Sequence, residues 1–70
     1  MEGQGSMKTF QEKQVIADRQ NGRVREVIVD RTPGAPTGSE RILLENFGEC
    51  YVHSCQPAGR DAFKITVRRA

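Results

Sequence analysis

Cys50, His53 and Cys55 are the residues whose types come nearest to a metal site or a catalytic pair. Thiolate and imidazole suit zinc, and a thiol beside a histidine can act as a nucleophile. On a strand, however, His53 and Cys55 share one face while Cys50 points to the other. His53 is the only histidine in the chain. We therefore predict no metal site, no cofactor and buried reduced thiols, with a metal bridging two chains as the alternative.

Other signs of catalysis are missing from the sequence. It holds no G-x-x-x-x-G-K-[ST], no G-x-G-x-x-G and no H-E-x-x-H motif. Side chains at positions i and i+2 of a strand stand about 7 Å apart, so His53 would not reach Cys55, and no third group is available to orient it. A chain of 70 residues also has little room for a walled pocket. We predict that the protein is not an enzyme.

Basic residues offer a different chemistry, because eight of the eleven are arginine, which forms bidentate contacts with phosphate or carboxylate. If the last strand adjoins the first hairpin, part of this set forms a continuous surface able to follow a nucleic-acid backbone. The sequence thus predicts a binding module for RNA or DNA. The candidate phosphate contacts are Arg23, Arg25, Lys64, Arg68 and Arg69.

A second hypothesis has nearly equal weight, because acidic residues are interspersed with the basic ones and such faces are commonly just solvated. The formal net charge of +2 does not require a polyanionic partner. Aromatic residues for base stacking are scarce, and we expect Phe47 to be the exposed one. The alternative is a protein–protein interaction module that uses a sheet edge or the 32–39 loop, including self-association as a homodimer.

Asn21-Gly22 is the clearest structural signal among the elements that would position these residues. Asn-Gly tolerates the positive φ angles of a type I′ turn and closes a two-residue hairpin. We expect strands over about 12–20 and 23–31. Four facing pairs follow from this turn: Asp18 with Arg25, Ile16 with Val27, Val15 with Ile28, and Lys13 with Asp30. In this arrangement Arg23 and Arg25 lie on one face and Arg19 on the other.

A second hairpin is predicted over 41–55, with Phe47-Gly48 at its tip, so that Leu44 faces Tyr51 and Leu43 faces Val52. The final segment 62–68 alternates regularly between apolar and polar residues. Its inward-facing residues are expected to be Phe63, Ile65 and Val67.

These elements predict an all-β fold: a small five-stranded antiparallel sheet or SH3-like barrel, built from two hairpins and a C-terminal strand. The segment 32–39, TPGAPTGS, has the composition of an extended, mobile loop. The competing interpretation makes 7–19 a helix.

Residues 1–6 are interpreted as an added leader or a flexible tail, and 7–70 as one domain. No apolar run approaches the roughly 20 residues needed to cross a bilayer, so we expect no membrane partner. Two cysteines are too few for a typical disulfide-stapled secreted domain of this size. We expect a cytoplasmic protein.

Overall fold

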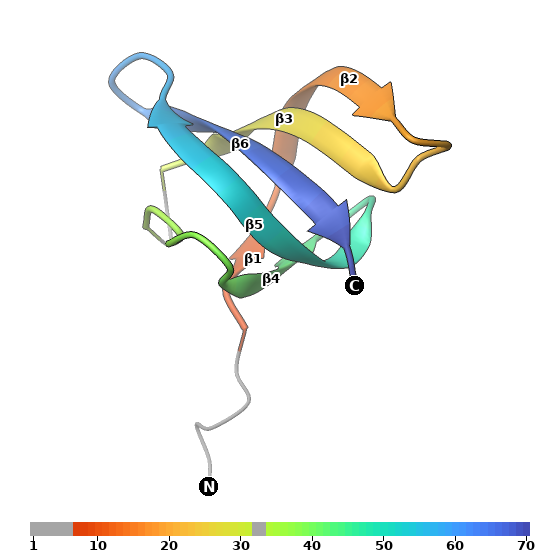
Figure 1. The fold of residues 1–70 in the computed structure, drawn as a ribbon. Coiled ribbons are helices and arrows are strands. Elements are labelled where there is room, and N and C mark those ends of the chain that lie inside the picture. Colours follow the sequence, from red (N-terminus) through yellow and green to blue (C-terminus); the bar gives the residue numbers. More distant parts are fainter. Residues whose placement is uncertain (1–6, 32–33) are drawn as a thin grey trace, which may run out of the picture.

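A single six-stranded sheet curls into half of a barrel in the computed structural model, which describes residues 7–31 and 34–70 (Figure 1). The strands are β1 (Thr9–Phe10), β2 (Glu12–Arg19), β3 (Val24–Asp30), β4 (Arg41–Leu44), β5 (Gly48–Pro57) and β6 (Ala62–Arg69). Their order across the sheet is β1-β4-β5-β6-β3-β2. The described segments contain no helix, and so none that is long and apolar enough to span a membrane.

The all-β prediction is confirmed, but the expected five strands and SH3-like architecture are not. The extra strand is β1, which pairs with β4 in parallel, so the sheet is not purely antiparallel. The helical alternative for 7–19 is wrong, because Phe10 enters the core and the residues after it pair with β3. The predicted tail 1–6 lies outside the described residues.

The first hairpin closes at the predicted turn. Asn21 and Gly22 have φ angles of 58° and 84°, as a type I′ turn requires. The amide of Arg23 donates to the carbonyl of Gln20 at 3.1 Å. Strands β2 and β3 end within a residue of their predicted positions, and Asp18 faces Arg25 as expected.

Two bulges in β2 overturn the rest of the predicted pairing in this hairpin. The register shifts between Glu12 and Gln14 and again between Val15 and Ala17. Val15 therefore faces Val27, and Gln14 faces Ile28. Lys13 and Asp30 are not register partners, although their side chains form an ion pair at 3.4 Å. A bulge bends and twists its strand, so the two bulges distort β2 at the edge of the sheet.

The second hairpin turns through three residues, 45–47, so the predicted pairing of Leu44 with Tyr51 is wrong. Leu44 faces Gly48 and Arg41 faces Tyr51. Gly48 has a φ of 95°, in the left-handed region that such a three-residue loop needs at its end. This loop folds Phe47 into the protein, where only 3% of its surface stays exposed. The prediction that Phe47 is exposed is therefore wrong as well.

The core lies on the inner face of the half-barrel and includes the predicted inward residues of β6. Ile65 and Val67 are fully buried, and Phe63 packs against the core while partly buried. Fully buried side chains also come from β1, β3, β4 and β5: Phe10, Val27, Val29, Ile42, Leu44, Cys50 and Val52.

The described part of the 32–39 loop is attached to the sheet. The Ser39 amide donates to the carbonyl of Val52 at 2.6 Å, and the Val52 amide donates to the carbonyl of Glu40 at 2.9 Å. Pro36 is buried. Thr32 and Pro33 lie outside the described residues.

Candidate nucleic-acid interface

Five side chains form a continuous row across the outer face of five strands. Successive members of this row face each other in direct cross-strand register. Neighbouring strands are about 4.8 Å apart, so the row spans about 19 Å and places three guanidinium groups and one phenol ring on one surface. We call this the outer row, and its members in order are Arg19, Val24, Arg68, Tyr51 and Arg41.

Arg68 is the central cation of the outer row and forms no ion pair with any described carboxylate. The two end members each pair with a carboxylate: Glu49, the partner of Arg41, is about half exposed, whereas the side chain of Glu26, the partner of Arg19, is 19% exposed. Arg19 lies 3.6 Å from Glu26, and Arg41 bonds to Glu49, which raises the pKa of the Arg41 guanidinium. An exposed pair such as that of Arg41 and Glu49 contributes little to stability, so Arg41 can exchange its carboxylate for a phosphate at low cost.

Tyr51 supplies the aromatic surface of the outer row. It is 43% exposed, the only aromatic residue among the exposed large hydrophobics of the described chain. The Arg41 guanidinium carbon lies 5.8 Å from the centre of its ring. An exposed ring between two arginines on an open sheet is the combination with which many proteins hold unpaired bases and their phosphates.

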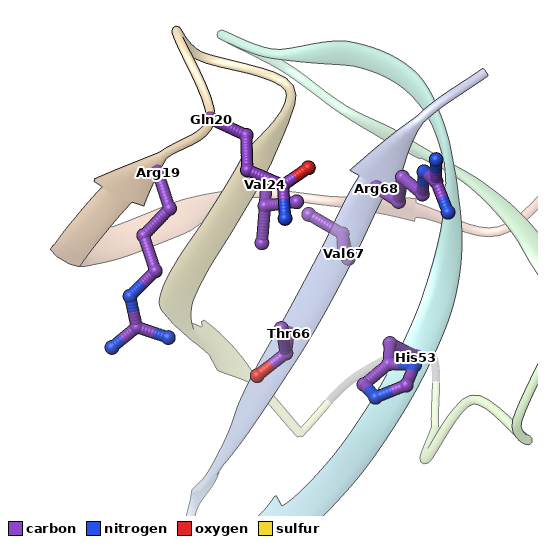
Figure 2. A pocket seen from close by; sticks show the side chains of 7 residues that line it. All are labelled: Arg19, Gln20, Val24, His53, Thr66, Val67 and Arg68. Carbon is purple, nitrogen blue, oxygen red and sulfur yellow. The ribbon is translucent and has the colours of Figure 1, made fainter.

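Two shallow hollows of about 270 and about 280 Å³ lie along the outer row. Figure 2 shows the first, where Arg19 and His53 stand on either side of Thr66, with Val24 and Arg68 above. The second hollow lies beside Tyr51. A third, of about 380 Å³, lies at the C-terminal end of the sheet between Arg23, Arg68, Arg69 and Ala70. Arg68 borders all three hollows.

Arg25, a predicted phosphate contact, lies on the opposite, inner face. Its guanidinium donates to Asp18 at 2.7 Å and to Glu12 at 2.7 Å, and these two bonds raise its pKa. The Glu12 side chain is only 2% exposed and also accepts the Asn46 amide at 2.7 Å. Both carboxylates therefore bind Arg25, which cannot bind a phosphate without leaving the buried charge of Glu12 unpaired.

Arg69 lies near Arg25, because both guanidinium groups lie over the buried ring of Phe47. Their carbons are 4.3 Å and 4.8 Å from the ring centre. Arg69 also donates to the carbonyl of Phe47 at 2.9 Å. Arginine over an aromatic face is favourable when the contact is partly desolvated. We call these side chains the inner cluster: Glu12, Asp18, Arg25, Phe47 and Arg69.

The five predicted phosphate contacts therefore do not all lie on one face of the sheet. Arg25 and Arg69 both belong to the inner cluster, and Arg69 also borders the hollow that it shares with Arg23 and Arg68. Lys64 is on the outer face but four residues from Arg68 along β6, or about 13 Å. The predicted continuous surface through Arg25 is wrong, because Arg25 and Arg68 occupy opposite faces.

The fold separates His53 from both thiols. Cys50 is buried in the core, which raises the pKa of its thiol to about 12. A bulge at His53 sends its ring outward while Cys55 faces Ile65 on the inner side, so the prediction that His53 and Cys55 share a face is wrong. Burial also raises the pKa of Cys55. Within 7–31 and 34–70 no three His, Cys, Asp or Glu residues are grouped as metal ligands.

No protein-family model, no curated protein and no solved structure matches the chain. Function must therefore be inferred from the chemistry of the outer row.

Sequence reasoning missed Tyr51, Arg41 and Arg19 as site residues. The alternation Cys50-Tyr51-Val52 contained a usable signal, because two small apolar residues facing inward turn Tyr51 outward. Arg41 was missed because the predicted hairpin placed Leu44 opposite Tyr51.

Proposed function

We propose that the protein is a non-enzymatic, cytoplasmic binding module for RNA or DNA that uses the outer row. The observation that carries this proposal is the cross-strand register of Arg19, Arg68 and Arg41 with Tyr51 between two of them. Arginine binds phosphate in bidentate fashion, and aromatic side chains on the open face of a sheet are a known support for stacked bases. Arg23, Lys64 and Arg69 supply further positive charge around the row, whereas Arg25 serves the fold.

The mild net charge of the chain is compatible with this proposal. Binding depends on where cations converge, and three guanidinium groups within about 19 Å can neutralise several phosphates although the whole chain carries only +2. Each neutralised phosphate of a single strand contributes about −0.7 to the slope of log affinity against log salt. Three contacts therefore predict a slope of about −2.

The test is a fluorescence-anisotropy titration of labelled single-stranded and duplex oligonucleotides at about 50 mM and about 200 mM salt, between which affinity should fall roughly 20-fold. The triple variant R19Q/R41Q/R68Q should lose most of the affinity and of the salt dependence. Arg60→Gln removes the same kind of charge from the turn at the opposite end of β6 and should lose little. Absence of saturable, salt-sensitive binding at low salt would remove the proposal.

A protein partner is the second candidate, favoured by the free edge of the sheet at β2. Val15 and Ile16 on this strand are each 44% exposed, and among the described strands β2 has only β3 as a neighbour. An unpaired edge with apolar side chains can accept another strand, including one from a second copy. The two bulges in β2 make this edge less able to pair with another strand. For that reason we place the protein partner second.

Sedimentation over a wide range of protein concentration tests the edge. Self-association that Ile16→Lys abolishes would support a β2 contact between copies. A strictly monomeric protein at high concentration would remove the homodimer. A partner that binds the 32–39 loop would instead be insensitive to Ile16→Lys.

A further inference from the structure

Two hollows of the outer face share a wall made by Arg68 and His53. The first contains Arg19, Gln20, Val24 and Thr66 in addition to these two residues. The second contains Ser39, Tyr51 and Val52. A cation thus stands between two adjacent recesses, one on the Tyr51 side and one on the Val24 side.

The two recesses differ in the chemistry that they offer. On one side, the exposed ring of Tyr51 presents an aromatic face suited to stacking a planar base. On the other side, Val24 provides an apolar surface, and the side chains of Gln20 and Thr66 around it can both donate and accept hydrogen bonds. Figure 2 shows the Gln20 amide directed toward Val24. The hollow beside Tyr51 therefore offers a stacking surface, whereas the hollow around Val24 offers polar side chains that can contact the edge of a base.

We propose that this surface binds single-stranded nucleic acid by a splayed dinucleotide step. One base stacks on Tyr51, its neighbour lies over Val24 in the first hollow, and the phosphate that links them binds Arg68. This inference rests on the proposed nucleic-acid function and specifies which form of nucleic acid the outer row takes.

Spacing excludes a duplex from this arrangement. Val24 and Tyr51 lie on either side of Arg68 in the register, two strand spacings or about 10 Å apart. Successive bases in a duplex strand rise by about 3.4 Å. Bases that reach both hollows must therefore leave their stack, which paired bases do only at the cost of unpairing.

Tyr51 supplies its own spectroscopic signal, because the chain has one tyrosine and no tryptophan. Stacking of a base on a phenol ring quenches its fluorescence, so intrinsic emission reports on this residue alone. We expect quenching that saturates with a short single-stranded RNA or DNA, and little quenching with the duplex of the same sequence. The single strand should bind at least roughly tenfold more tightly than the duplex, since stacking one base contributes about that factor.

Three variants separate the ring from the charge. Tyr51→Ala should weaken single-strand binding roughly tenfold and leave the salt slope unchanged, whereas Tyr51→Phe should retain the affinity. Arg68→Gln should lower the magnitude of the salt slope by about 0.7. Because Tyr51 and Arg68 are exposed, these variants are expected to fold, and circular dichroism checks that they do.

The outcomes distinguish this inference from the proposed function. Equal binding of duplex and single strand, with no effect of Tyr51→Ala, overturns the dinucleotide step and leaves the proposed function standing. An equal loss in Tyr51→Phe and Tyr51→Ala overturns stacking in favour of a contact to the hydroxyl. If neither single strand nor duplex binds at low salt, the inference and the proposed function are overturned together.

Discussion

Arginine has a different role in the inner cluster from the one it has in the outer row. In the inner cluster Arg25 is held by two carboxylates and a buried ring, and its partner Glu12 is almost fully enclosed. In the outer row Arg68 stands on an open face and has no ion-pair partner among the described carboxylates. One arginine completes the fold and the other is available to a ligand.

The alternation of side chains along a strand causes this difference. Val24 and Arg25 are neighbours in sequence, yet Val24 faces Arg68 on the outer face and Arg25 faces the buried Val67 on the inner one. Because alternate residues of a strand point to opposite faces, a count of arginines around a hairpin cannot say how many of them can act together. Charge must be assigned to a face before it is assigned to a function.

The largest effect should come from removing the ring on which the inner cluster is built. Phe47→Ala empties a site that is 3% exposed and withdraws the surface beneath Arg25 and Arg69. We expect the free energy of unfolding to fall by about 3 kcal/mol, a large part of the stability of a small domain. Urea denaturation followed by circular dichroism measures it. An exposed Phe47, as the sequence predicts, would instead give a change under about 0.5 kcal/mol.

A matched pair of arginine substitutions compares the two regions directly. Arg25→Met keeps an unbranched apolar stem but leaves the Glu12 carboxylate buried without its partner, and we expect a loss of about 2 to 3 kcal/mol in unfolding free energy. Arg68→Met is the control and should stay within about 0.5 kcal/mol. Equal losses would show that the two arginines do not differ as their surroundings imply.

Much of the fold could be predicted because local signals agreed with one another. Asn21-Gly22 determined a turn, and the alternation through Ile65 and Val67 identified the inward face of β6. These features depend on residues close in sequence. The opposite orientation of Arg19 and Arg25 followed from the same turn and is confirmed.

The bulges and the second hairpin could not be predicted in the same way. Val15 and Ile16 are alike in size and polarity and are equally exposed, at 44%, so their residue types do not select Val15 as the partner of Val27. Phe47-Gly48 fits the tip of a two-residue or the end of a three-residue loop. The choice depends on Phe47 reaching Arg25 and Arg69, contacts that are distant in sequence. That choice also brings Arg41 to Tyr51, and the candidate site was missed for this reason.

A pH dependence of intermediate size should arise from the inner face. Burial, with a smaller contribution from the charge of Glu12, raises the pKa of the Cys50 thiol from 9.0 to about 12. The unfolded chain loses this proton near pH 9 while the folded protein keeps it, so stability is complete below pH 9 and is lost as the pH rises toward 12. By pH 10 the loss should be about 1 kcal/mol.

Cys50→Ala provides the control for this dependence, because other groups also titrate above pH 9. The variant is less stable at pH 8 for loss of packing, but its unfolding free energy should fall less between pH 8 and pH 10 than that of the parent protein. Urea denaturation at both pH values measures the difference. Parallel declines in the two proteins would argue against a protonated, buried thiol.

The smallest effect should come from releasing an arginine of the outer row. Glu49→Gln removes the carboxylate that holds Arg41, at a position where both side chains are about half exposed. An anion about 8 Å from a bound phosphate repels it by about 0.5 kcal/mol in water, so nucleic-acid affinity at low salt should rise about twofold. Anisotropy titrations of parent and variant measure this gain, and high salt should suppress it. The same neutralisation at Glu12, in the inner cluster, would lower stability and leave nucleic-acid affinity unchanged. A Glu49→Gln variant that binds nucleic acid more weakly would show that Glu49 positions Arg41 for its ligand and does not compete with that ligand.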